Sequence, residues 1–194
     1  VHTNATCLPS DFVRRQTETN MRSEQLWRDL RTKNDWAGFA PSFENVVALP
    51  GSGRDATTAF LSGTGDVLLS YENETILARQ EGAELDYFVP DETLLIENPG
   101  AVLKDAHPRA QAWLEFVLSE EGQTEFVKKG FRSLNDDVTG VEVEGANDPS
   151  DPFPQPTELF TVGELFGGWS AVNEKFFAEG TGLVSKVQAE TGKV

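Results

Sequence analysis

The pattern of apolar positions in residues 66–80 predicts a strand followed at once by a helix. An apolar run from Val67 to Leu69 is typical of a strand that is buried on both faces. Residues 72–80 read as a helix. Tyr71 stands between the two, at the carboxyl end of the strand. In an open α/β sheet this edge is where ligands usually bind.

Strand and helix patterns continue to alternate downstream. Strands are predicted at residues 85–89 and 93–96, and helices begin near Pro108 and Ser119, the second ending toward Val127. Such alternation indicates an α/β layer. A further helix follows the glycine pair before Trp169. Between these elements residues 135–156 read as a long polar loop, because they combine many carboxylates with several prolines and glycines.

One of these helices carries a conspicuous apolar stripe. Ala112, Trp113, Phe116 and Val117 recur at helical spacing. We expect these side chains to lie in the core, and we expect no ligand-stacking role for Trp113.

The first 48 residues have a different pattern. A helix is predicted from Pro9 through about Arg31, and a second over residues 42–49, so the segment forms a helical hairpin that must bury its stripe against the rest of the chain. The domain prediction is therefore a helical segment at 1–48 and an α/β domain at 49–194.

Candidate binding chemistry lies in the glycine-rich turn before the first strand. Gly51 and Gly53 permit positive φ, and Asp55 or Thr57 can N-cap a helix over residues 56–61. Several free N–H groups would then converge on one point, and such a nest binds an oxyanion. The alternative is a tight loop without a ligand. The turn is neither a P-loop nor a dinucleotide fingerprint, since it lacks the Gly-Lys-Ser/Thr sequence and the third glycine.

Five sequence blocks resemble a known family, in that family's order. They are Gly-Arg-Asp-Ala-Thr-Thr-Ala-Phe (53–60), Gly-Asp-Val-Leu-Leu-Ser-Tyr-Glu-Asn-Glu (65–74), Val-Pro-Asp-Glu-Thr-Leu-Leu-Ile-Glu-Asn-Pro (89–99), Ala-Trp-Leu-Glu-Phe-Val-Leu-Ser-Glu-Glu-Gly-Gln (112–123) and Leu-Phe-Thr-Val-Gly-Glu-Leu-Phe-Gly-Gly-Trp (159–169). Residues 47–182 thereby resemble the C-terminal part of the sulfate and thiosulfate receptors of bacterial ABC importers. The resemblance implies a partial periplasmic-binding-protein fold of type II, with a mixed sheet and flanking helices beside the N-terminal helical hairpin.

The resemblance also implies the site. Gly53 would be the backbone donor of the turn, with Arg54 beside it, and Tyr71 falls where the family usually has a tryptophan donor. Together with Thr57 these residues would form one wall of an oxyanion site. Asp55 replaces a usual glycine, and its carboxylate would compete with a bound dianion for the same amides. The family's remaining ligands come from sequence that precedes this turn.

Residues 5–49 resemble a different family: they are similar to a helical segment of the carboxypeptidase Taq zinc peptidases. No His-Glu-x-x-His motif is present, and the two histidines, His2 and His107, are isolated, so peptidase chemistry is not expected. We interpret the chain as a chimera joined near residue 48. The alternative is a chance similarity between helical segments.

Composition narrows the function classes. The 32 acidic residues against 16 basic ones give a net charge of −16, which argues against nucleic acid as a partner. Cys7 is the single cysteine, so no intramolecular disulfide or cysteine-rich metal site can form. We expect no enzyme activity, no cofactor and no metal site, since no nucleophile–base pair is apparent. No apolar run is long enough to span a membrane.

Two functional hypotheses remain. In the first, the chain is part of an importer's receptor, binds sulfate or thiosulfate, and has the importer's membrane subunits as partners. In the second, it is a folded chimera or fragment with no evolved activity. We find no export signal in the sequence, so a periplasmic or extracytoplasmic location is only what the receptor resemblance implies. Because half of a receptor would leave apolar surface exposed, we also expect a homodimer formed by exchange of elements.

Overall fold

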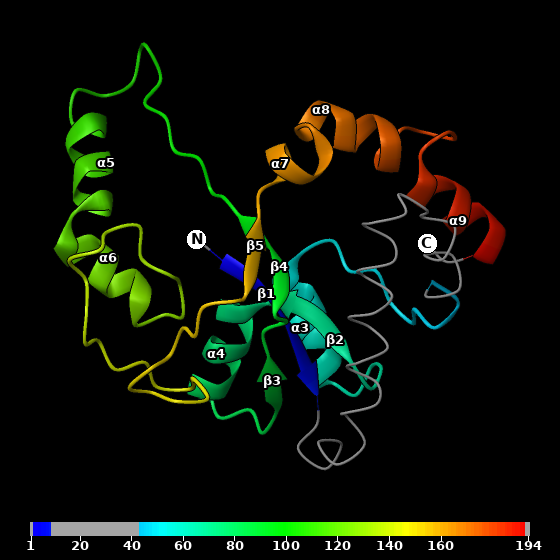
Figure 1. The fold of residues 1–194 in the computed structure, drawn as a ribbon, viewed down its shortest axis with the longest axis horizontal. Coiled ribbons are helices and arrows are strands. Elements are labelled where there is room, and N and C mark those ends of the chain that lie inside the picture. Colours follow the sequence, from blue (N-terminus) through cyan, green and yellow to red (C-terminus); the bar gives the residue numbers. More distant parts are fainter. Residues whose placement is uncertain (1, 9–42, 193–194) are drawn as a thin grey trace.

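The structure, a computed structural model, describes residues 2–8 and 43–192 (Figure 1). Five strands in the described residues form one sheet. They are β1 (His2–Leu8), β2 (Leu68–Tyr71), β3 (Asp86–Phe88), β4 (Glu92–Ile96) and β5 (Glu158–Phe160).

β1 is the strand that holds this sheet together. β2 runs antiparallel along one side of it, with Ala5 opposite Ser70. β3 and β4 lie antiparallel on its other side, one after the other. β5 then adds to β4 in parallel, with Thr93 opposite Leu159. The predicted mixed sheet with flanking helices is therefore confirmed.

β1 corrects the prediction for the start of the chain. Residues 2–8 were assigned to a helical segment, but they form a strand because three other strands supply backbone partners for them. This tertiary pairing outweighs a weak local preference. Of the predicted second helix, the structure describes a helical end at residues 43–44 and no regular structure from 46 to 50. The rest of the predicted hairpin lies outside the described residues.

Helices flank the sheet. The sequence predicted α3 (Gly53–Leu61), α4 (Glu72–Gln80), α5 (Ala110–Leu118), α6 (Glu120–Val127) and α8 (Trp169–Val172), the last of which continues into the π-helix η3 (Asn173–Phe177). It missed β5, α7 (Val162–Phe166) and α9 (Leu183–Thr191). In Figure 1, α5 and α6 stand on one side of the central strands and α7 to α9 on the other.

The main core forms around α4. Ile76 of this helix is completely buried, and so is Val143 from the long loop between α6 and β5. Around them pack Phe60, Leu68, Ala78, Leu85, Tyr87, Val127 and Ala146. Burial raises the pKa of the Tyr87 phenol above its ordinary value. The predicted polar loop contains no helix or strand. Its residues Val143 and Ala146 nevertheless pack into the core.

A buried ion pair joins this loop region to α4. Arg132 makes two hydrogen bonds to the Glu72 carboxylate, from Nε at 2.9 Å and from Nη2 at 3.1 Å. The side chains of Arg132 and Glu72 are only 9% and 1% exposed. Arg132 also donates to the backbone carbonyls of Phe153 and Pro154 and lies over the Phe153 ring. One guanidinium thus connects the start of α4, the segment after α6 and the end of the loop.

A smaller apolar cluster lies among the C-terminal helices. It consists of Val162, Val172 and Phe176, with Phe166 packed edge-on against Phe176. α7 begins with a capping box, in which Thr161 and Glu164 each accept a hydrogen bond from the other's backbone amide. The amide and hydroxyl of Thr161 hold the pKa of the Glu164 carboxyl below its ordinary value.

Two predictions of burial are wrong. Leu69, expected inside a doubly covered strand, is 80% exposed, whereas Leu68 beside it is 9% exposed, so only one face of β2 is covered. In α5, Trp113 is 67% exposed and Phe116 48% exposed, and no residue of the helix is buried. The apolar stripe of α5 was recognised correctly, but its side chains are exposed or only half-buried in the described part of the chain.

The buried ion pair leads to the first testable expectation. Arg132→Met removes the guanidinium that makes two hydrogen bonds to the buried Glu72 carboxylate, and we expect the free energy of unfolding to fall by about 3–5 kcal/mol. Urea denaturation followed by circular dichroism measures this. Adding Glu72→Gln to the same variant removes the buried carboxylate charge and restores part of the loss.

Lys128→Met is the matched control. Lys128 pairs with Glu125, but both side chains are well exposed, so the loss stays within about 1 kcal/mol. Equal losses in the two single variants would show that burial does not strengthen the Glu72–Arg132 pair.

Candidate functional site

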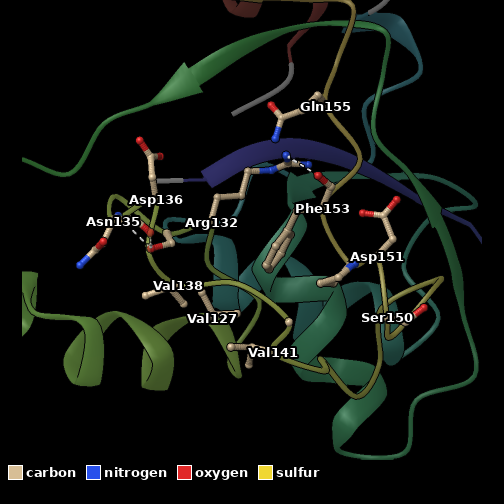
Figure 2. A pocket seen from close by; sticks show the side chains of 13 residues that line it. Val127, Arg132, Asn135, Asp136, Val138, Val141, Ser150, Asp151, Phe153 and Gln155 are labelled. Atoms are coloured by element: carbon tan, nitrogen blue, oxygen red, sulfur yellow. Dashed lines mark hydrogen bonds between the residues drawn. The ribbon is translucent and has the colours of Figure 1, made fainter.

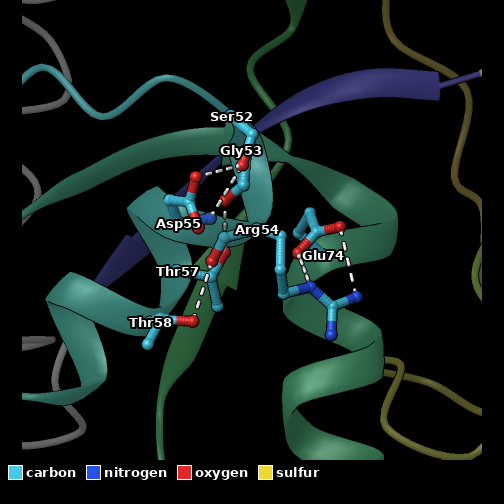
Figure 3. A network of polar contacts seen from close by, with 7 residues as sticks. All are labelled: Ser52, Gly53, Arg54, Asp55, Thr57, Thr58 and Glu74. Carbon is cyan, nitrogen blue, oxygen red and sulfur yellow. Dashed lines mark hydrogen bonds and ion pairs between the residues drawn. The ribbon is translucent and has the colours of Figure 1, made fainter.

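The predicted anion-binding turn forms the start of α3. Ser52 is the N-cap, and its Oγ accepts a hydrogen bond from the Asp55 amide at 3.1 Å. The Ser52 hydroxyl in turn donates to Asp55 Oδ2 at 2.8 Å (Figure 3). The prediction that Asp55 or Thr57 caps the helix is therefore wrong. The helix starts earlier, because serine is an equally good cap and stands three residues before an acidic side chain.

Capping leaves two amides at this helix end for other acceptors. The Asp55 amide is taken by Ser52, and the Ala56 amide donates to the Ser52 carbonyl. Within residues 43–192, no acceptor is found for the amides of Gly53 and Arg54. Free N–H groups at a helix N-terminus carry partial positive charge and attract anions.

Gly53 is required by a close contact rather than by its φ angle. A Cβ on Gly53 would lie 2.9 Å from Cε2 and 3.0 Å from Cδ2 of the Tyr71 ring. Neither Gly51 nor Gly53 has a positive φ, so that prediction is wrong. Instead, the absence of a side chain at Gly53 lets the aromatic ring approach the α3 backbone. The structure therefore brings together Gly53 and Tyr71, two of the predicted site residues.

Tyr71 also marks the start of a second helix. It ends β2, is the N-cap of α4, and is 38% exposed. The N-termini of α3 and α4 therefore meet at the Gly53–Tyr71 contact. A helix N-terminus carries partial positive charge, and two neighbouring N-termini favour an anion between them.

The place where the N-termini of α3 and α4 meet is the α3–α4 corner. The other two predicted residues, Arg54 and Thr57, stabilise it by contacts of their own. Arg54 makes a two-point ion pair with Glu74 of α4, from Nε at 2.9 Å and from Nη2 at 3.3 Å (Figure 3). The Thr57 hydroxyl donates to the Gly53 carbonyl at 3.1 Å, and Thr57 is buried. Arg54 thus joins α3 to α4, while the Thr57 side chain bonds within its own helix.

The acidic residues at the start of α4 are neutralised. Its first turn contains Glu72 and Glu74, which would oppose an incoming anion. Glu72 is paired with Arg132 and Glu74 with Arg54, in both cases through two hydrogen bonds. The positive end of the helix therefore keeps its attraction for an anion, although carboxylates surround it.

A separate pocket of about 340 Å³ lies beside Arg132, between the segment after α6 and the loop before β5 (Figure 2). None of the four predicted site residues lines it. The Arg132 guanidinium at its edge is already bonded to Glu72 and to two carbonyls, and the pocket wall includes Asp136 and Asp151. This pocket is therefore a poor place for an anion, and the α3–α4 corner is the better candidate.

Sequence reasoning missed the residues that hold the corner in place. Ser52 was detectable, because a serine followed three residues later by an acidic residue is a cap pattern. The two ion pairs gave no local sequence signal. Arg54 and Glu74 lie 20 residues apart in the sequence, and Glu72 and Arg132 lie 60 residues apart.

Comparison with known proteins places the chain in a family. A sequence model of the family described as bacterial extracellular solute-binding protein matches residues 18–132, more than half of the chain. The chain belongs to this family. The match crosses the junction predicted near residue 48, so residues 18–48 lie in the matched region. A chimeric origin and the resemblance to carboxypeptidase Taq remain predictions.

Individual relatives agree with this assignment. A sulfate-binding protein of Synechococcus elongatus is 40% identical over 152 residues, which cover 75% of this chain and 41% of that protein. A thiosulfate-binding protein of Pseudomonas aeruginosa is 31% identical over 147 residues, 71% of this chain and 42% of that protein. The chain thus spans about two fifths of the length of the curated relatives it matches.

A solved structure resembles most of this chain. The sulfate-binding protein SubI from Mycobacterium tuberculosis aligns with a TM-score of 0.68 and 28% identity, covering 91% of this chain and 69% of that one. Among the described residues, no helix of this family member combines the length and apolar character needed to cross a bilayer. The same residues bring no three His, Cys, Asp or Glu side chains together as metal ligands.

The Gly53–Tyr71 contact can be tested directly. Gly53→Ala places a methyl group against the Tyr71 ring, so we expect the ring to move and the free energy of unfolding to fall by about 1–3 kcal/mol. Chemical denaturation and the NMR signals of the Tyr71 ring report the two effects.

Gly51→Ala is the matched control, two residues away. Its methyl group meets nothing within 4 Å, so we expect a change within about 0.5 kcal/mol and unmoved Tyr71 signals. An unchanged Tyr71 spectrum in Gly53→Ala would contradict the packing described here.

Proposed function

We propose that the chain is part of a receptor that binds sulfate or thiosulfate at the meeting point of α3 and α4. The amides of Gly53 and Arg54 and the Tyr71 hydroxyl are the donors of this wall. The observation that carries the proposal is the contact between Gly53 and Tyr71 at two adjacent helix N-termini. Relatives named for sulfate and thiosulfate binding support the choice of ligand.

Two side chains of the predicted site take supporting roles in this proposal. Arg54 contributes its amide, while its side chain neutralises Glu74. Thr57 keeps the first turn of α3 in place through its bond to the Gly53 carbonyl. Asp55 competes with the anion less than its charge suggests, because its carboxylate accepts a hydrogen bond from the Ser52 hydroxyl. The anion is therefore recognised mainly by backbone dipoles, which need no counter-charge.

The proposal extends to the whole receptor. In a full-length protein the remaining donors come from the part of the family fold that this chain does not span. The fold would be of the periplasmic-binding-protein type II, the partners would be the membrane subunits of an ABC importer, and the location would be extracytoplasmic. The isolated chain should therefore bind its anion more weakly than a complete receptor, because each hydrogen bond to a charged group contributes about 1.5–3 kcal/mol.

Calorimetric titration with sulfate, thiosulfate and molybdate tests the proposed ligand. We expect saturable binding of sulfate or thiosulfate. Tyr71→Phe removes one donor to a charged ligand and should weaken binding about ten- to a hundredfold. Gly51→Ala should bind as the unaltered chain does. Absence of saturation by all three anions would favour the alternative, a folded chimera or fragment with no evolved activity.

The neutralised acidic turn provides a second test. Arg54→Gln exposes the Glu74 charge at the helix end, and we expect anion affinity to fall about two- to fivefold. The double variant Arg54→Gln/Glu74→Gln removes both charges and should recover the affinity. If the double variant binds no better than the single one, Arg54 acts by direct contact with the anion and not through Glu74.

A further inference from the structure

Asp55 is the acidic residue at the α3–α4 corner that has no arginine partner in the described part of the chain. The first turn of α3 contains Asp55, and that of α4 contains Glu72 and Glu74. Glu72 pairs with Arg132, and Glu74 pairs with Arg54. Residues 43–192 place no cation within ion-pair distance of Asp55. Its negative charge therefore remains beside the proposed anion site.

The Asp55 carboxylate also has an oxygen atom that a ligand can use. Oδ2 accepts a hydrogen bond from the Ser52 hydroxyl at 2.8 Å, which turns the side chain back toward Ser52 and Gly53 at the start of α3 (Figure 3). Oδ1 has no donor among the described residues, and the side chain is exposed. An ionised carboxylate accepts hydrogen bonds but cannot donate them. Oδ1 can therefore bond only to a ligand group that carries a proton.

The rest of the proposed site consists of donors, namely the amides of Gly53 and Arg54 and the Tyr71 hydroxyl. Sulfate and thiosulfate, when fully ionised, carry acceptor atoms only, so they match these donors but not Asp55. Hydrogen phosphate has the tetrahedral shape and the double negative charge of sulfate, but one of its oxygen atoms carries a proton. It can accept from the amides and donate to Asp55 Oδ1 at the same time.

We propose that Asp55 is a specificity-determining residue of the α3–α4 corner, and that it favours oxyanions carrying a proton, such as hydrogen phosphate, over fully ionised ones. The charge of Asp55 opposes both dianions alike, so charge does not separate them. The difference is one hydrogen bond, which hydrogen phosphate makes to Oδ1 and sulfate cannot make. Sulfate and thiosulfate remain ligands, with lower affinity. This preference rests on the proposed function, because it concerns the ligand class of the same site.

NMR titration of the 194-residue chain tests the preference, with the amide signals of Gly53 and Arg54 as the readout. The probes are sulfate, hydrogen phosphate and fluorophosphate, at a mildly alkaline pH where phosphate is a dianion with one proton. Fluorophosphate is a dianion of the same shape in which fluorine replaces the hydroxyl group. We expect hydrogen phosphate to bind about three- to tenfold more tightly than the other two, the effect of one additional hydrogen bond.

Asp55→Asn keeps the shape of the side chain and an oxygen atom that accepts the Ser52 hydroxyl. Because a negative charge is lost, all three dianions should bind more tightly. Sulfate should gain most, so the ratio of hydrogen phosphate affinity to sulfate affinity should fall about three- to tenfold. Asp55→Ala removes both carboxylate oxygen atoms and should lower the ratio in the same way. Ser52 still caps α3 in this variant, since its Oγ accepts from the backbone amide of residue 55.

Glu81→Gln is the matched control, because it also removes one negative charge. Glu81 is exposed and is the C-cap of α4, at the opposite end of that helix from the corner. The ratio of the two affinities should stay as it is in the unaltered chain. A purely electrostatic or structural effect of Asp55 would likewise change the affinities for all three dianions together and leave their ratio unchanged.

The outcomes separate this preference from the proposed function. Sulfate binding with an affinity ratio that Asp55→Asn leaves unchanged would overturn the role of Asp55 and leave the proposed function standing. Equal affinities of the unaltered chain for hydrogen phosphate and fluorophosphate would overturn that role as well. Binding of hydrogen phosphate alone would support the role of Asp55 and count against sulfate as the ligand. Gly53 and Arg54 signals that no anion shifts would overturn both.

Discussion

The buried ion pair between Glu72 and Arg132 is the interaction on which the arrangement of this molecule depends. Both charges are almost fully removed from water, and such charges are tolerated only when paired and fully hydrogen-bonded. Arg132 meets this requirement with Glu72 and two carbonyls of the loop before β5. The start of α4 is therefore fixed against a segment far away in the sequence.

Fixing the start of α4 also positions the candidate site. Tyr71 immediately precedes Glu72, so its ring is held where Gly53 can approach it. Glu74, two residues after Glu72, meets Arg54 of α3. One buried pair and one half-exposed pair thus join two helix N-termini into a corner. The same two arginines cancel the carboxylates that would weaken the attraction of those termini for an anion.

This local neutralisation explains how an acidic protein can offer the proposed anion site. The net charge of −16 is spread over the whole chain, and exposed charges more than about 10 Å away are largely screened at 0.1 M salt. What an anion meets at the corner is a small set of amide dipoles. The proposed site therefore needs no excess of positive charge. The site requires only that nearby carboxylates already accept hydrogen bonds from other side chains, as those of Glu72, Glu74 and Asp55 do.

The sequence by itself determined the elements whose signals are local: the strand ending at Tyr71, the helix over residues 72–80, the α5 stripe and the family blocks. Only the tertiary structure decided which neighbours those elements have. It placed residues 2–8 in the sheet, left Leu69 and Trp113 uncovered, and paired Glu72 with Arg132. The physical reason is that hydrophobic periodicity records which face of an element prefers burial, whereas the partner that covers it, or neutralises a charge, comes from residues distant in the chain or outside it.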